Sequence, residues 1–294
     1  MNEPSDTAAP VPPNARRALL SRMCALAMVG IGSTTLTACG GGGGGGGGGL
    51  ALLGAAAPAP GAAPAPAPGP APAPAPAPTP DTPALGAHAL AFNLDGVSSA
   101  SLATSAISTR ATASTFLVGV GRGVLAASVP TDNAGNAFVQ LGESHVYTLW
   151  PNSGTALYAT AQARGSDAYV VTAEKPKVTD ETTLSVVEIT GGGIVRDVQW
   201  REVLSGQPLT SASVTTTGPA LLVAWWWGDA GVDLDKTAVP DNGFTVIDSV
   251  LASGALVQCA VAVRQVGAAG TYNVTWTSTP QQGAQLWLIA VQTA

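Results

Sequence analysis

The sequence predicts an all-β protein whose folded part is an antiparallel β-sandwich, and three observations carry that prediction. Polar and apolar residues alternate with a period of two in many short runs, such as Thr271–Thr277 and Val257–Arg264. Clusters of glycine, proline, asparagine and aspartate separate these runs. No window keeps the apolar period of 3.6 that indicates a helix. Many short strands with such turns favour a sandwich, and we expect a jelly roll.

The strands are expected between residues 86 and 294, which we take as one folded domain. They are Thr115–Val120, His145–Trp150, Thr155–Gln162, Ala168–Ala173, Thr183–Thr190, Ala220–Trp227, Phe244–Val250, Val257–Arg264, Thr271–Thr277 and Gln285–Gln292. Turns are expected at Asp132–Asn136, Pro151–Gly154, Gly191–Gly193 and Pro240–Gly243. The spacing is too irregular for a propeller, and no internal repeat is evident.

The first residues have the order of a secretory signal. Arg16, Arg17 and Arg22 form a positive region, and the apolar run Met23–Ile31 follows. This run is too short to cross a bilayer as a helix, which takes about 20 apolar residues. A signal that is cleaved off is therefore expected over a transmembrane anchor.

Leu36-Thr37-Ala38-Cys39 ends this region. It resembles the lipobox of bacterial lipoproteins. The resemblance implies that residues 1–38 are a signal peptide and that Cys39 becomes the acylated first residue. Two acyl chains or more hold a protein stably on a bilayer, so the lipid bilayer would be its partner.

The residues around this signal bear on export and sorting. Gly40, and not Asp, follows the cysteine, which by analogy with enterobacterial sorting favours the outer membrane. The pair Arg16-Arg17 partly resembles a twin-arginine signal, with the general secretory route as the default.

Residues 39–85 are expected to be a tether. Ten glycines, Gly40–Gly49, precede alternating alanine and proline that continue to Pro80. Glycine loses much backbone entropy on ordering, whereas proline favours an extended polyproline II chain of about 3.1 Å per residue. Pro58–Pro80 would then reach roughly 70 Å. Recognition as a proline-rich ligand is the alternative, but Ala-Pro repeats without basic flanks are more often spacers.

Three stretches of the folded part resemble a poorly characterised β-sandwich module of bacterial secreted and surface proteins. They are Thr131–Phe138, with an Asp-x-x-Gly-Asn turn, Val214–Val223, with a Thr-rich strand before Leu-Leu-Val, and Ala268–Trp276, with a Gly-x-Tyr strand. The resemblance implies a sandwich and an apolar last strand, Leu286–Val291, and it carries over no catalytic residue.

Charge and cysteine content limit the classes of partner and the possible role of the remaining thiol. Twelve Lys and Arg stand against 18 Asp and Glu, for a net charge of −6, which disfavours nucleic acid and electrostatic docking to membranes. The lipobox resemblance implies that Cys24 leaves with the signal and that Cys39 is acylated, which would make Cys259 the remaining thiol. It lies between valines, and we expect it in the core.

Trp225, Trp226 and Trp227 are the most unusual feature of the domain. On a strand, Trp225 and Trp227 face one way and Trp226 the other, each beside apolar neighbours, which indicates a central strand. An exposed indole among them would be a platform for a sugar ring. The alternative is that all three pack in the core.

Asp229, Asp233 and Asp235 follow the tryptophans. Calcium takes six to eight oxygen ligands, so three carboxylates in seven positions could begin a structural calcium site. The spacing matches no EF-hand loop, and a solvated acidic loop is the alternative.

Signals for an enzyme are few. His88 and His145 are the two histidines, and we expect His145 to be a strand residue. A glycosidase needs two carboxylates about 5–9.5 Å apart, and Glu143, Glu188 and Glu202 are the available candidates.

The sequence therefore favours a lipid-anchored surface protein, without catalysis, whose sandwich binds a glycan. The competing hypothesis is an assembly protein that packs an apolar face near Trp226 on a partner protein. A glycan-cleaving enzyme is the third.

Overall fold

The computed structural model describes residues 82–123, 128–205, 207–229 and 235–293. The expected signal peptide, Cys39, nearly all of the tether and Asp233 lie outside these residues. Within them every regular element is a β-strand and the strands pair antiparallel, which confirms the all-β prediction. In this part of the chain, no helix has the length and apolar character that a membrane crossing requires.

The first half of the domain is a complete jelly roll. Its strands are β1 (Ala84–Asn93), β2 (Ser101–Ala103), β3 (Ser114–Arg122), β4 (Thr131–Asp132), β5 (Val139–Tyr147), β6 (Trp150–Ala163), β7 (Val171–Glu174) and β8 (Thr182–Thr190). A large sheet has the order β1-β8-β3-β6-β5 and a small sheet the order β2-β7-β4. Pairing of first with eighth, third with sixth and second with seventh strands defines the jelly roll.

The second half repeats this topology. Its strands are β9 (Gly193–Val203), β10 (Leu209–Thr210), β11 (Val214–Thr216), β12 (Ala220–Gly228), β13 (Thr237–Pro240), β14 (Thr245–Val250), β15 (Cys259–Val266), β16 (Gly270–Tyr272), β17 (Thr275–Thr279) and β18 (Ala284–Thr293). The large sheet is β9-β18-β12-β15-β14 and the small sheet β10-β17-β13, with β11 and β16 as an added pair. Equivalent strands therefore follow one another in the same order in the large sheets of the two halves.

Local hydrogen bonds repeat as well. Val171 N donates to Thr104 Oγ1 at 3.1 Å, and Thr104 N donates to Val171 O at 2.9 Å. In the second half Val274 N donates to Ser211 Oγ at 3.2 Å, and Ser211 N donates to Val274 O at 2.9 Å. The chain therefore contains two jelly rolls of the same topology, a structural repeat that the sequence did not reveal.

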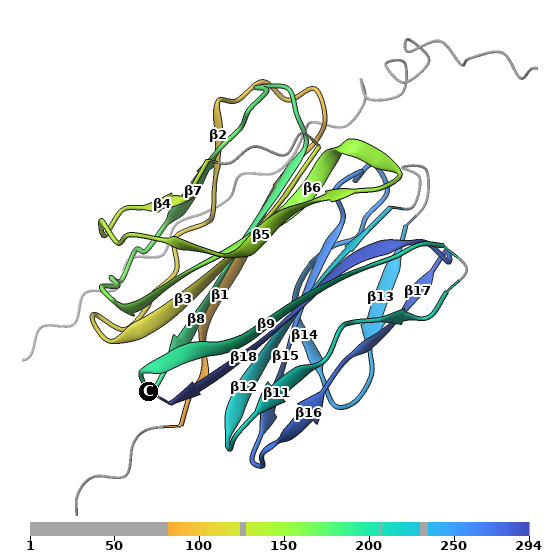
Figure 1. Cartoon of the computed structure of the whole chain (residues 1–294). Helices are drawn as coiled ribbons and strands as arrows, with labels where there is room; N and C mark the ends of the chain where they lie inside the picture. Colours follow the sequence, from red (N-terminus) through yellow and green to blue (C-terminus); the bar gives the residue numbers. More distant parts are fainter. Residues whose placement is uncertain (1–81, 124–127, 206, 230–234, 294) are drawn as a thin grey trace, which may run out of the picture. The chain divides into compact units, whose positions relative to one another are not determined.

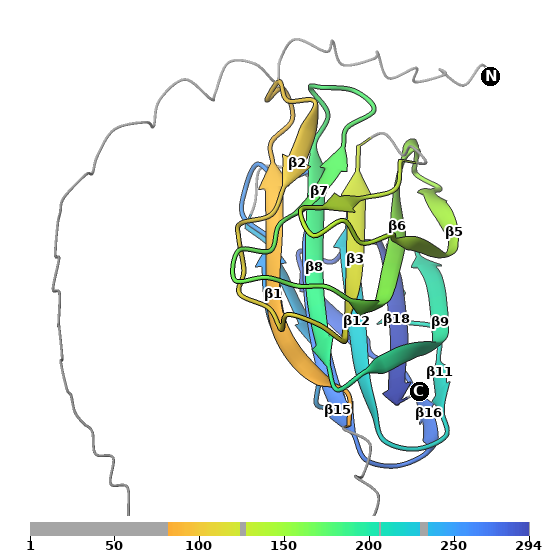
Figure 2. The same ribbon diagram turned by 90° about the vertical axis from the view of Figure 1, so that its left-hand side faces the viewer.

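The two jelly rolls pack through their large sheets, with the small sheets on the outside (Figure 1). Figure 2 shows the large sheet of the first jelly roll in front of strands of the second. Three apolar cores result, one inside each jelly roll and one between them. The inner strands β3, β8 and β18 are buried along nearly their whole length. Burial on both faces explains the apolar runs Phe116–Val120 in β3 and Leu286–Val291 in β18.

Most of the expected strands are present, with three corrections. Thr148 and Leu149 form a turn between β5 and β6, so His145–Trp150 is not one strand. The expected turn Pro151–Gly154 lies inside β6. The run Thr271–Thr277 is divided between β16 and β17, although Tyr272, Val274 and Trp276 do share the core of the second jelly roll.

Candidate functional site

The three consecutive tryptophans lie inside the protein. Trp225 and Trp226 are fully buried, and Trp227 is 5% exposed. Trp225 and Trp227 belong to the core between the jelly rolls, and Trp226 to the core of the second jelly roll. The predicted central strand with two apolar faces is confirmed, since β12 is the middle strand of its sheet. None of Trp225, Trp226 and Trp227 is an exposed platform for a sugar ring, so the hypothesis that one of them binds a sugar is wrong.

Three indoles of the second jelly roll donate a hydrogen bond to a residue of the first jelly roll. Trp225 Nε1 donates to Ser185 Oγ at 2.8 Å, and Trp227 Nε1 donates to Thr183 Oγ1 at 3.0 Å. Trp287 Nε1, on β18, donates to Thr155 Oγ1 at 2.8 Å. A buried indole N–H usually finds such a partner, although those of Trp200, Trp226 and Trp276 have none among the described residues. The tryptophans therefore hold the two large sheets in one register.

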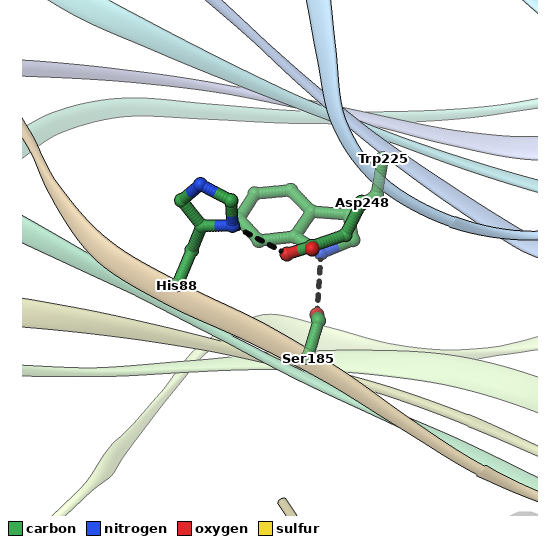
Figure 3. A network of polar contacts seen from close by, with 4 residues as sticks. All are labelled: His88, Ser185, Trp225 and Asp248. Carbon is green, nitrogen blue, oxygen red and sulfur yellow. Dashed lines mark hydrogen bonds and ion pairs between the residues drawn. The ribbon is translucent and has the colours of Figure 1, made fainter. Parts of the chain in front are cut away.

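A histidine and an aspartate add a contact at one margin of this interface. His88 Nδ1 on β1 lies 2.8 Å from Asp248 Oδ2 on β14. Figure 3 shows this pair beside the indole of Trp225 and its bond to Ser185. Because each of these two contacts joins the first jelly roll to the second, His88 has a structural role here.

The opposite margin is closed by stacked rings. His145 on β5 lies parallel to Trp200 on β9, with ring centroids 3.8 Å apart. Burial lowers the pKa of His145, against a smaller opposite effect of Glu143. His145 is thus a strand residue in an aromatic stack, as expected.

The carboxylates considered for calcium or catalysis are engaged within the protein. Asp229 accepts hydrogen bonds from the Tyr147 hydroxyl and from Gly283 N, and Asp235 accepts one from Ser253 N. Among the described residues no group of three or more His, Cys, Asp or Glu side chains is placed to hold a metal. Asp229 and Asp235 thus each join their own loop to the backbone of another segment, and Asp233 lies outside the described residues.

Two of the three glutamates considered for glycan cleavage also accept hydrogen bonds within the protein. Glu188 is 2% exposed and accepts bonds from Ala87 N, Arg110 N and Ser114 Oγ. Glu202 accepts bonds from Thr148, and Glu143 is exposed on β5. Glu188 and Glu202 thus position backbone.

Cys259 is fully buried in the core between the jelly rolls, as predicted. Burial raises the pKa of its thiol well above the ordinary value. A thiol in that state is a small apolar side chain and a poor nucleophile.

Large apolar side chains are exposed around one hairpin turn of the described residues, and they include Trp150, which the sequence left open as a contributor to a sugar platform or to the core. We define the hairpin patch as Val146, Leu149 and Trp150, which are 46%, 51% and 56% exposed. They surround the turn between β5 and β6. Thr148 N donates to Glu202 Oε1 of β9 at 2.7 Å, and this bond fixes the turn. The signal was present as Leu149-Trp150-Pro151, which the sequence placed at a strand end.

Fold and interface together define the class of protein: two jelly rolls of one topology, packed face to face through buried tryptophans. Comparison of the chain with models of protein families, with curated proteins and with solved structures finds no match.

Proposed function

We propose that this chain is a non-catalytic bacterial lipoprotein that displays its double jelly roll outside the membrane and binds a protein partner through the hairpin patch. The observation that supports binding is the exposure of Trp150. Large apolar side chains clustered on a surface mark interaction sites, and tryptophan is enriched in them.

The kind of partner follows from the neighbours of the indole. Leu149 adjoins Trp150 in the chain, Val146 lies four residues before Trp150, and both are about half exposed. A sugar site needs polar groups that converge on a groove beside the ring, whereas an apolar patch suits the buried centre of a protein interface. We therefore favour the assembly hypothesis over glycan binding. Glycan binding was suggested by an expected exposure of Trp225–Trp227, and these residues are buried.

The anchor rests on the lipobox resemblance of Leu36-Thr37-Ala38-Cys39. Diacylglycerol on Cys39 would hold the chain on the outer membrane, and the stretch from Gly40 to Pro80 would carry the jelly rolls away from it. The variant Cys39→Ser tests this step. We expect it to move from the membrane fraction to the soluble fraction of the envelope, and continued membrane association contradicts the anchor.

The binding surface is tested by photo-crosslinking in cells. A photoreactive amino acid replaces Leu149 in the full chain, and a matched control carries it at Val239, which is 59% exposed on the second jelly roll. We expect a discrete protein adduct from position 149 that Trp150→Ala removes and that position 239 does not give.

Two outcomes contradict a protein partner at this patch. One is that positions 149 and 239 give the same adducts. The other is saturable binding of a glycan that Trp150→Ala abolishes, which would assign the patch to sugar.

A further inference from the structure

A groove of about 370 Å³ opens on the first jelly roll, where β5 and β6 pass the beginning of β9. Ala137, Val139 and Leu141 line it from β5 and the residues before it, Ala159 and Ala161 from β6, and Val195 from β9. The described residues that line it carry no charge. Its volume lies within the range of small-ligand sites.

The groove exists because the two jelly rolls differ at equivalent positions. Leu117 pairs with Ala159 as Val223 pairs with Val263, and Phe116 pairs with Thr160 as Leu222 pairs with Arg264. Alanine and threonine of the first jelly roll thus stand where the second has valine and arginine. The first jelly roll is hollow where the second carries larger side chains.

The described chain begins at the margin of this groove. Pro83 is buried, and a Cβ on Gly193 would lie 3.2 Å from Pro83 Cβ, so the two residues are in contact. Gly193 O accepts a bond from Thr115, which lines the groove, and Val195 follows two residues along β9. The first described residues, Thr82 and Pro83, therefore lie next to the groove.

We propose that the groove binds the adjoining segment Ala73–Asp81 of the same chain. Four of these nine residues are proline and three are alanine, and Asp81 alone is charged. Proline has no backbone N–H, so burying this segment leaves few donors without partners. Proline-rich sequences favour the polyproline II conformation before they bind, which lowers the entropy cost of binding.

Because the segment and the groove belong to the same chain, even a weak contact between them is enough to keep the groove occupied. A segment joined to the site by a few residues has an effective concentration in the millimolar range. Docking of nine residues would withdraw about 28 Å from an extended tether at 3.1 Å per residue. The groove then sets how far the jelly rolls stand from the point of attachment, and a partner that displaces the segment would lengthen the reach.

Methyl NMR of the full chain in detergent micelles tests this proposal. We expect cross-relaxation between the Val139 and Val195 methyl groups and proline Hδ protons. Serine in place of Pro74, Pro76, Pro78 and Pro80 keeps the length and should abolish these signals. The matched control replaces Pro64, Pro66, Pro68 and Pro70 with serine and should retain them.

Filling the groove is an independent test. Ala159→Val copies the residue of the second jelly roll and should also abolish the signals. Equal Val139 and Val195 shifts in the native chain and both serine variants overturn the proposal. The proposal is also overturned if these shifts change with protein concentration in the native chain and in both serine variants, because a second copy then occupies the groove. These readouts involve neither Trp150 nor Cys39, so their failure leaves the proposed function standing.

Discussion

Gly119 on β3 faces Trp225 on β12, and the two residues occupy equivalent positions in the two jelly rolls. Ser114 opens the pairing of β3 with β6 as Ala220 opens that of β12 with β15, and Gly119 and Trp225 each lie five residues further on. A Cβ on Gly119 would lie 2.6 Å from Trp225 Nε1. One jelly roll thus supplies the space that the indole of the other fills.

The first prediction concerns this fit. Gly119→Ala should lower the free energy of unfolding by about 1–3 kcal/mol, because an added methyl group overpacks the interface. Gly121→Ala should have a similar effect, since its Cβ would lie 2.3 Å from Trp227 Nε1. Urea unfolding measures both. Gly267→Ala is the control, because nothing lies within 4 Å of a Cβ there, and an equal loss in all three variants contradicts the account.

The second prediction concerns the bond from Trp225 Nε1 to Ser185 Oγ. Trp225→Phe should cost about 2–4 kcal/mol, because volume is lost and the Ser185 hydroxyl loses the donor that it accepts from. Adding Ser185→Ala to that variant should cost less than Ser185→Ala does in the native chain, because the hydroxyl has then already lost its donor. A double-mutant cycle measures the coupling, and additive effects would show that the bond does not join the sheets.

The third prediction concerns pH and Glu181, which is 2% exposed. Its Oε1 accepts bonds from Leu256 N at 2.6 Å and Val257 N at 2.7 Å, so this residue of the first jelly roll binds the second. Burial raises the pKa of this carboxyl from 4.5 to about 7. The folded protein then holds a proton that the unfolded chain has released between these two pH values.

Stability should therefore fall as the pH rises from about 4.5 to about 7, by roughly 3 kcal/mol from this residue, and stay level above. Glu181→Gln keeps the Oε1 acceptor and removes the titration. The free energy of unfolding of native chain and variant, measured from pH 4 to pH 8, should converge toward low pH. A constant difference across that range contradicts the raised pKa.

The fold could be predicted from the sequence in part. Alternation in runs such as Ala220–Trp227 correctly indicated strands, the two faces of β12 and the jelly-roll class. The repeat could not be recognised in the same way, because equivalent positions are complementary and not similar, as with Gly119 and Trp225. Short signals do mark it, since Val129-Pro130 and Val239-Pro240 each precede an Asp-Asn turn.

The candidate site was harder to predict. Period-two alternation gives the face of a residue within its sheet, but not what covers that face. For Trp225 and Trp227 the cover is a second sheet that the sequence did not reveal. Trp150 is exposed because the chain turns at Thr148 and Leu149, where no glycine, asparagine or proline marks a turn.

Association of the separated jelly rolls tests the central claim most directly. Each large sheet comes from one half of the chain, and Gly191 and Gly192 join the halves. Residues 82–191 and 193–293, produced as two chains, should form a one-to-one complex in sedimentation. Trp225→Ala with Trp227→Ala should abolish this complex, and Trp150→Ala should leave it intact. Two halves that stay monomeric when mixed, or a complex that survives loss of both indoles, would contradict the claim.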